Sequence, residues 1–169
     1  MKRVLLMRHA KSSWKDTAVP DHDRPLAGRG KRAAKAMGRY MRDEQVAPAL
    51  VLCSTARRAR ETLARIEPGM ARHSVRVERQ LYGASADALL ERLRRVPDTF
   101  DSVLVIGHNP GLQELALYLA APSAERDELG AKYPTAALAT LEVSAESWRA
   151  VDPGSARLVG FVRPRDLES

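Results

Sequence analysis

The chain has 169 residues, of which 44% are hydrophobic and 29% are charged. This length and composition predict one compact domain with its own core and leave little room for a second. No apolar run approaches the ~20 residues that a membrane-spanning helix needs, and the apolar N-terminal segment meets a charge again at Arg8. We therefore expect neither a membrane span nor a signal peptide.

The cysteine content indicates a cellular compartment, and the net charge indicates a class of binding partner. Cys53 is the only cysteine, so no internal disulfide is possible, and one thiol with four histidines leaves no structural zinc cluster. A reducing cytoplasm is the expected location. The 28 Lys and Arg residues outnumber the 21 Asp and Glu residues, which gives a net charge of +7. This excess indicates an anionic partner such as nucleic acid, a phosphate or an acidic protein surface.

The first half of the chain alternates apolar strands with amphipathic helices. Residues 3–7 (R-V-L-L-M) form a short apolar run typical of a buried strand, and residues 11–30 are polar and rich in Asp, Pro and Gly, which indicates a loop. A helix is predicted from 31 to about 45, because its apolar residues recur at helical spacing. A second buried strand over 49–53 leads into a helix over 56–66, which a Pro-Gly pair ends.

The second half repeats this alternation. Residues 74–81 contain alternating valines and predict a third strand, and Ser85 is a suitable N-cap for the helix that follows. Residues 103–107 (V-L-V-I-G) form the most continuous β-branched run and lead through the turn H-N-P-G straight into another helix. Two further strands over 136–143 and 157–162 complete the predicted elements.

This alternation predicts an α/β fold: a single-domain three-layer α/β/α sandwich with a mostly parallel sheet. Ligands of such sheets bind beyond the carboxyl ends of the strands. The residues that follow three of the predicted strands are cationic or reactive, namely Arg8, His9, Ser54, Arg57, Arg58 and His108. We therefore expect these side chains to converge on one site.

Simpler interpretations exist for each of these residues. A histidine at a strand end is often only a polar residue that closes the strand. The arginines between 57 and 65 can be a solvated helix face, with an i, i+4 pair between Arg57 and Glu61. Arg58, however, lies at the start of its helix and can point back toward the strand ends. The turn after the fourth strand also presents a helix N-terminus, which attracts anions.

Three segments of the sequence resemble motifs of one enzyme family. Residues 5–10 (L-L-M-R-H-A) resemble the opening R-H-G motif of the histidine phosphatase (phosphoglycerate mutase-like) superfamily, with Ala10 in place of the usual glycine. Residues 53–62 (C-S-T-A-R-R-A-R-E-T) resemble its S-P-x-x-R-A-x-x-T segment, which places the family arginine at Arg58. Residues 105–110 (V-I-G-H-N-P) resemble its second-histidine segment.

The spacing of these motifs, the short chain, and the segments 23–26 (D-R-P-L) and 132–136 (K-Y-P-T-A) look most like the SixA-type phosphohistidine phosphatases. The resemblance covers nearly the whole chain. It implies a phosphoglycerate mutase-like fold for a histidine phosphatase domain over 1–164, followed by a short C-terminal tail over 165–169.

The resemblance also implies a metal-independent phosphatase that passes through a covalent phosphohistidine intermediate and needs no cofactor. By that resemblance His9 is the nucleophile, and Arg8 and Arg58 hold the phosphoryl oxygens with fork-like hydrogen bonds. His108 contacts the phosphoryl group from the opposite side, and a bound dianion favours its protonated form. Thr135 is a further substrate-binding residue. The expected substrate is a phosphorylated protein histidine or another phosphoramidate.

One expected group is missing from the sequence. Larger members of the family place a glutamate after the third strand to protonate an alcohol leaving group, whereas residues 81–87 here read L-Y-G-A-S-A-D. The rival acids are Asp16, Asp21, Asp23 and Asp87. Without a strong acid, an imidazole that leaves from a phosphoramidate suits the site better than an alkoxide does.

Other classes of function are also compatible with the sequence. Within the superfamily, the chain can be a phosphomonoesterase of small phosphorylated molecules. Outside catalysis, Ala10 leaves open a phosphoprotein-binding domain, and the net charge of +7 alone favours a nucleic-acid-binding domain. We expect no specific nucleic-acid partner, because the two Phe, four Tyr and two Trp residues are dispersed and form no stacking motif. The sequence indicates no particular oligomeric state.

Overall fold

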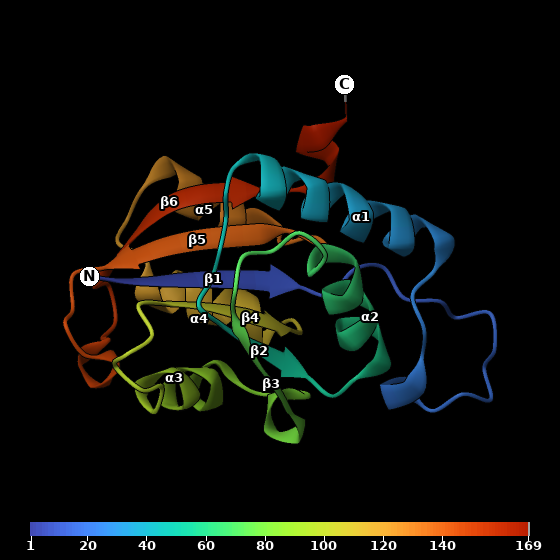
Figure 1. The fold of residues 1–169 in the computed structure, drawn as a ribbon, viewed down its shortest axis with the longest axis horizontal. Helices are drawn as coiled ribbons and strands as arrows, with labels where there is room; N and C mark the ends of the chain where they lie inside the picture. Colours follow the sequence, from blue (N-terminus) through green and yellow to red (C-terminus); the bar gives the residue numbers. More distant parts are fainter. Residues whose placement is uncertain (169) are drawn as a thin grey trace.

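A computed structural model describes residues 1–168 of the protein. Six strands form one sheet in the order β3-β2-β4-β1-β5-β6. Figure 1 shows the tips of β1 and β2 at the same end of this sheet. The strands are β1 (Lys2–Arg8), β2 (Leu50–Ser54), β3 (Ser74–Glu78), β4 (Ser102–Gly107), β5 (Leu138–Val143) and β6 (Ala156–Val162).

The sheet is mixed but mostly parallel. The pairs β3 with β2, β2 with β4, and β4 with β1 are parallel, whereas β5 pairs antiparallel with both β1 and β6. Parallel neighbours need a long crossover connection, and the chain supplies helices for these crossovers. The connection from β5 to β6 carries only a short 3-10 turn, so these two strands pair directly as antiparallel neighbours.

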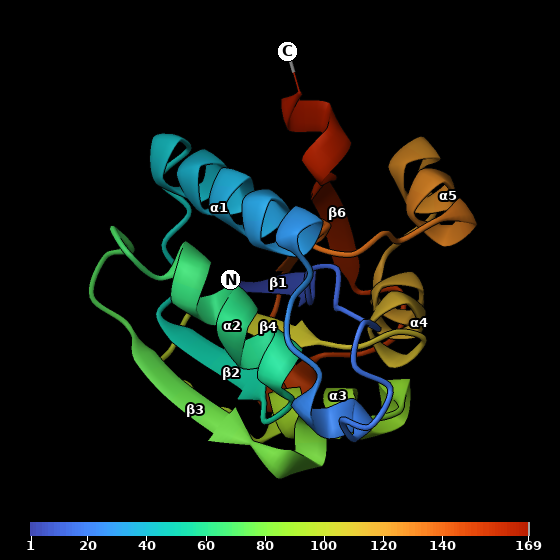
Figure 2. The same ribbon diagram turned by 90° about the vertical axis from the view of Figure 1, so that its right-hand side faces the viewer.

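Helices cover both faces of the sheet, as Figure 2 shows end-on. The centre of strand β1 explains why both faces need cover: alternate side chains point to opposite sides, and the four from Val4 to Met7 are all apolar and buried. Val4 and Leu6 pack into one core cluster, and Leu5 and Met7 into the other. The helices of the second cluster are α1 (Gly28–Asp43) and α2 (Arg57–Ile66), and those of the first are α3 (Ala86–Arg94), α4 (Gly111–Leu119) and α5 (Ala124–Ala131).

This three-layer arrangement confirms the predicted α/β fold class. The predicted N-cap is also confirmed, because the Ser85 hydroxyl accepts a hydrogen bond from the Ala88 N–H. Burial of each large apolar side chain of β1 contributes about 1.5–3 kcal/mol, so the two clusters hold the central strand rigidly between the helices. The end of β1 is therefore a fixed platform for the residues that follow it.

Several predicted boundaries are wrong, for local physical reasons. The third strand stops at Glu78, and a 3-10 turn over Arg79–Leu81 follows it. The strand predicted from 136 begins at Leu138, because Ala136 has a φ of 65°, in the left-handed region that a strand cannot contain. The helix predicted from 31 already begins at Gly28.

Helix α5 is absent from the predicted elements. Only Leu129 of its eight residues is buried, so its sequence carries no apolar periodicity that would indicate a helix. Its start has a clear signal, since the Ser123 hydroxyl accepts a hydrogen bond from the Arg126 N–H. A serine is common outside helix starts, so a capping residue alone does not predict a helix when no amphipathic pattern follows it.

The C-terminal segment packs onto the domain. A 3-10 turn, η4 (Pro164–Leu167), follows β6, and Leu167 packs against the cluster that α1 and α2 form with the sheet. The boundary between a domain ending at 164 and a tail over 165–169 stays a prediction, and residue 169 lies outside the described residues. Over residues 1–168, each helix is too short or too polar to cross a membrane.

The contact between α1 and α2 leads to a stability prediction. A Cβ atom at Gly38 would lie 2.8 Å from the Arg65 carbonyl oxygen and 3.0 Å from the Ile66 Cα, so Gly38→Ala must push the two helices apart. Although alanine favours helices, we expect a loss of about 1–3 kcal/mol in the free energy of unfolding, measured by urea denaturation.

The matched control is Gly28→Ala in the same helix. A Cβ atom there meets only the flexible end of Arg32, at 3.5 Å, and a change within about 0.5 kcal/mol is expected. An unfolding midpoint for Gly38→Ala equal to that of the unsubstituted protein would contradict this account of the helix contact.

Candidate active site

The carboxyl ends of β1, β2 and β4 bring three predicted residues together. His9 follows β1, Arg58 lies in the first turn of α2 after β2, and His108 follows β4. The His9 and His108 ring centroids are 5.1 Å apart. The Arg58 guanidinium contacts both rings, with Nε 3.3 Å from His9 Nε2 and Nη2 3.5 Å from His108 Nδ1. The strand ends therefore converge as the sheet topology predicts.

His9 presents an unprotonated ring nitrogen to this cluster. Its Nδ1 lies 2.7 Å from the Ala10 carbonyl oxygen, which can only accept, so Nδ1 carries the proton and Nε2 keeps a lone pair. The side chain is buried, and burial is the main reason that its pKa is lowered from 6.5 to about 3. The charges of Arg58 and Arg8 lower it further. His9 is therefore a neutral imidazole with Nε2 available as a nucleophile.

His108 is neutral as well, in the opposite tautomer. Arg58 can only donate to its Nδ1, so Nε2 carries the proton and donates to the Ser54 hydroxyl at 2.8 Å. Burial lowers its pKa to about 4, the charge of Arg58 lowers it further, and the carboxylate of Asp21 acts in the other direction. A protonated His108 in a complex therefore depends on the added charge of a bound dianion.

Arg58 and its neighbour Arg57 occupy different environments. Arg58 is 6% exposed and donates from Nη1 to the Asp21 carbonyl oxygen at 2.7 Å and from Nη2 to the Asp21 carboxylate at 3.1 Å. The Arg57 side chain is 49% exposed and pairs with Glu61 on the outer face of α2. Only Arg58 points back over the strand ends.

Arg8 lies at the edge of the same cluster. Its Nη1 donates to the Tyr133 carbonyl oxygen at 2.9 Å, and burial followed by the charge of Arg58 lowers its pKa. Its Nε is buried and has no hydrogen-bond partner among residues 1–168. Thr135 is placed differently, because it lines a groove beside the cluster and no hydrogen bond within residues 1–168 joins its side chain to the other site residues.

Backbone contacts fix the position of His9. The Thr62 hydroxyl accepts from the Ala10 N–H at 3.0 Å and donates to the Arg58 carbonyl oxygen at 2.8 Å, so it joins the loop after β1 to α2. On the other side, the Ala136 N–H lies 3.1 Å from the His9 carbonyl oxygen. Such support holds a reactive side chain in one orientation.

Asp21 is the one aspartate among the four rival acids that enters the site. Its carboxylate accepts from Arg58 and from the Tyr82 hydroxyl, which is 2.5 Å away. These hydrogen bonds, that of Tyr82 first, lower its pKa to about 2, so Asp21 is ionised at neutral pH. The three others, Asp16, Asp23 and Asp87, are exposed and contact neither histidine of the site among residues 1–168.

Tyr82 is a further residue of the site, and its role was not predicted from the sequence. Its ring lies edge-on to His108 with centroids 5.5 Å apart, and its hydroxyl donates to Asp21. Tyr82 lies in the segment after the third strand, where larger members of the family place a glutamate, and its phenol is the proton-bearing side chain of that segment that reaches the site. The bond to Asp21 raises its pKa.

The structure also bears on a cysteine nucleophile and on a metal site. Burial raises the pKa of the Cys53 thiol to about 12, so this residue is not a rival nucleophile. Within residues 1–168, no three side chains of His, Cys, Asp or Glu are grouped as ligands for a metal ion.

Comparison with known proteins now establishes the family. The family described as "Histidine phosphatase superfamily (branch 1)" matches residues 4–83. The uncharacterized protein Rv1276c of Mycobacterium tuberculosis is 44% identical over 163 residues, which cover 94% of this chain and all of that protein. The chain therefore belongs to the histidine phosphatase superfamily, as its motifs predict. An Arabidopsis thaliana relative, "Uncharacterized protein At3g52155, chloroplastic", is 31% identical and matches 96% of this chain and 78% of its own length.

Solved structures of SixA proteins have the same fold as this chain. The "Putative Phosphohistidine Phosphatase SixA" from Nakamurella multipartitia is 34% identical, with a TM-score of 0.83 over 96% of each chain. A structure of the protein histidine phosphatase SixA complexed with tungstate has the same fold, with a TM-score of 0.81 over 98% of this chain and 99% of that one at 23% identity. The predicted resemblance to SixA-type proteins is confirmed at the level of structure.

The low pKa of His108 predicts a loss of stability in mild acid. In the unfolded chain this residue takes up a proton near pH 6.5, and in the folded chain only near pH 4. The contribution of neutral His108 to the free energy of unfolding is therefore fully present above pH 6.5 and is lost as the pH drops toward 4. This linkage is worth up to about 3 kcal/mol at pH 4. We expect His108→Gln to reduce the acid-induced fall in melting temperature.

His73→Gln is the matched control for this measurement. The Ala71 carbonyl and then Glu67 raise the pKa of His73, so its contribution is present in acid and is lost as the pH rises. Its removal must therefore leave the acid-induced fall in place or steepen it. The same pH dependence of melting temperature in His108→Gln and the unsubstituted protein would contradict the assignment of a neutral buried His108.

Proposed function

We propose that the protein is a metal-independent phosphatase that removes a phosphoryl group from a histidine of another protein through a covalent phosphohistidine intermediate on His9. The observation that carries this proposal is the pairing of a neutral His9 Nε2 with the buried Arg58 guanidinium, 3.3 Å away. A nucleophile and a cationic group for the phosphoryl oxygens thus lie side by side, as in-line phosphoryl transfer requires.

In the first step, His9 Nε2 attacks phosphorus as the bond between phosphorus and the substrate nitrogen breaks. The ring gains positive charge as the new P–N bond forms, and the Ala10 carbonyl, which accepts from Nδ1–H at 2.7 Å, stabilises that charge. The leaving imidazole takes a proton from water. Arg58 and Arg8 hold the nonbridging oxygens, and the buried Arg8 Nε, which has no hydrogen-bond partner within residues 1–168, can donate to one of them.

In the second step, water attacks phosphorus and the bond to His9 Nε2 breaks, and the proton that this water releases to solvent balances the one that the leaving imidazole took from water in the first step. Inorganic phosphate leaves, and the neutral ring of His9 is restored. His108 faces His9 across the Arg58 guanidinium and is assigned to the opposite side of the phosphoryl group. Thr135 is assigned to the substrate beyond the phosphoryl group, because it lines the adjoining groove.

The acid-base groups of the site favour a phosphorus–nitrogen bond in the substrate. Asp21 is ionised, and the pKa of Tyr82 is raised, so neither is a strong acid for an alkoxide leaving group. An imidazole leaves from a phosphoramidate with less need for such an acid. The likeness to the "Putative Phosphohistidine Phosphatase SixA" at 34% identity supports the same substrate class. A reducing cytoplasm suits the buried free thiol of Cys53.

A panel of substrates tests this proposal. We expect phosphohistidine protein, phosphoramidate and p-nitrophenyl phosphate to be hydrolysed far faster than glycerol phosphate or sugar phosphates, and His9→Ala to abolish turnover without unfolding the chain. A brief reaction with labelled phosphoramidate and an alkaline quench should leave an acid-labile label on His9.

The same panel of substrates distinguishes this proposal from a small-molecule phosphatase and from a noncatalytic binding domain. Efficient hydrolysis of alkyl phosphates would favour a phosphatase of small molecules, and binding of phosphoprotein without turnover would favour a noncatalytic domain. A label on Ser54 or Cys53 would contradict the mechanism through His9.

Arginine replacements test the phosphate-binding group. Arg58→Lys keeps the charge but loses the fork that contacts Asp21 and both histidines, so kcat/KM should fall by a factor that corresponds to about 2–4 kcal/mol. Arg57→Lys is the matched control, because this exposed side chain pairs with Glu61 on the outer face of α2, and its effect should be small. Equal losses in both variants would contradict the assignment to Arg58.

A further inference from the structure

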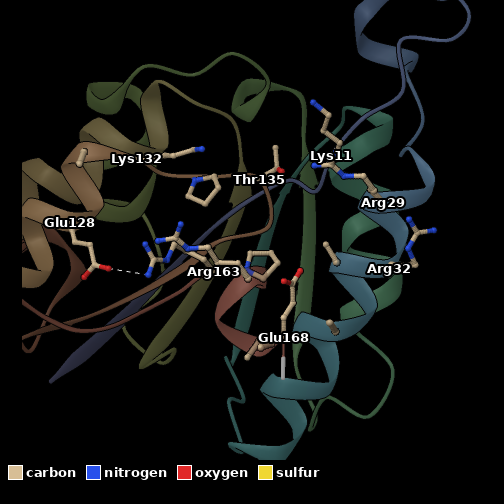
Figure 3. A pocket seen from close by; sticks show the side chains of 15 residues that line it. Lys11, Arg29, Arg32, Glu128, Lys132, Thr135, Arg163 and Glu168 are labelled. Carbon is tan, nitrogen blue, oxygen red and sulfur yellow. Dashed lines mark ion pairs between the residues drawn. The ribbon is translucent and has the colours of Figure 1, made fainter.

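A groove of about 850 Å³ opens beside the active site (Figure 3). One wall is α1 with Arg29 and Arg32, and the other is formed by the chain from Glu128 to Thr135 and by Arg163. The groove also has an apolar part, which we call its floor. The apolar lining residues are Ala33, Ala36, Ala131, Pro134, Pro164 and Leu167.

The groove carries an excess of positive charge. Its lining contains six Lys and Arg residues but only Glu128 and Glu168 as anions. Arg163 pairs with Glu128 and with Asp166. The other five cations form no ion pair among residues 1–168 and are exposed, namely Lys11, Arg29, Arg32, Lys132 and Arg165. Cations around an apolar floor fit an acidic ligand with some apolar surface.

The groove adjoins the candidate active site through two segments of the chain. Lys11, which lines the groove, lies two residues after His9. The lining residues Lys132 and Pro134 flank the buried Tyr133, whose carbonyl oxygen accepts a hydrogen bond from Arg8. A ligand in the groove therefore lies next to the residues proposed to hold the phosphoryl group.

The dimensions of the groove distinguish a polypeptide from a single anion. The lining residues Arg29 to Ala36 extend along α1 for about 10 Å, because a helix rises ~1.5 Å per residue. That length fits about three residues of extended chain and exceeds the reach of one phosphate ion. None of the lining residues is aromatic, so the groove offers no surface on which nucleic acid bases stack.

We propose that this groove binds an acidic segment of the polypeptide that carries the phosphorylated histidine. This inference rests on the proposed function, since it assigns the groove to the same substrate protein. Carboxylates of the segment pair with Arg29, Arg32 and Lys132, while its apolar groups lie on the floor. The small substrate phosphoramidate reaches only the catalytic residues and gains nothing from the groove.

Synthetic peptides test this proposal. Each contains one phosphorylated histidine with three glutamates placed either before or after it, and a matched peptide carries glutamines instead. We expect one of the acidic peptides to exceed its glutamine partner in kcat/KM by about tenfold at low salt, the scale of a few exposed ion pairs, and less at high salt. The double variant Arg29→Glu, Arg32→Glu should lose this preference and keep its turnover of phosphoramidate.

The double variant Lys31→Glu, Lys35→Glu is the matched control. It makes the same charge change on exposed residues of α1 that do not line the groove, so it should keep the preference. An equal loss in both double variants would show a general effect of net charge and overturn the proposal. No preference for either acidic peptide would overturn it as well.

A binding measurement separates this proposal from the proposed function. The unphosphorylated acidic peptides, labelled with fluorescein, should bind the unsubstituted protein and the control variant more tightly than the Arg29→Glu, Arg32→Glu variant. Failure to hydrolyse any phosphopeptide contradicts the proposed function, whereas failure of these peptides to bind contradicts the groove assignment. Binding of an eight-nucleotide RNA that depends on Arg29 and Arg32, without peptide binding, would also overturn the proposal.

Discussion

The buried guanidinium of Arg58 is the constraint on which the active site depends. A guanidinium stays protonated at any physiological pH, and a buried charge is stable only when its donors are satisfied. Asp21 supplies a carboxylate and a carbonyl oxygen, and the two histidines supply ring nitrogens as acceptors. Each histidine must therefore present an unprotonated nitrogen to Arg58. The charge that organises the cluster thus acts in the same direction as burial, and both favour the neutral form of His9.

The fold makes this arrangement possible by placing the contributing residues on rigid elements. His9 and His108 follow neighbouring parallel strands that are buried on both faces, and Arg58 begins a helix packed on the sheet. The Thr62 hydroxyl then couples the loop after β1 to that helix. The loop that carries Asp21 is tied to the fold as well, because Leu26 packs into a core cluster and the buried Arg24 donates to the Ser12 hydroxyl at 2.6 Å.

Much of the site could be predicted from the sequence, because strand ends are visible as apolar runs and a parallel sheet brings those ends together. The same reasoning could not place Asp21, which lies in a polar loop without periodicity and meets Arg58 only through the tertiary fold. Tyr82 could not be predicted as a site residue, because a tyrosine beside a turn forms no sequence motif that indicates its contacts. Helix α5 and the left-handed Ala136 were missed for a related reason, since one buried leucine and one unusual φ leave no trace in composition.

The buried position of Cys53 has a practical consequence for studying this molecule. Its thiol lies within the core on β2, is fully covered, and is held in the protonated form by its surroundings. Because it is the only cysteine of the chain, thiol-directed reagents meet no competing target on the native surface. A single cysteine introduced on the exposed face of a loop or helix would therefore accept a fluorophore or spin label at one defined position. The native sequence is thus already a clean background for spectroscopic distance measurements.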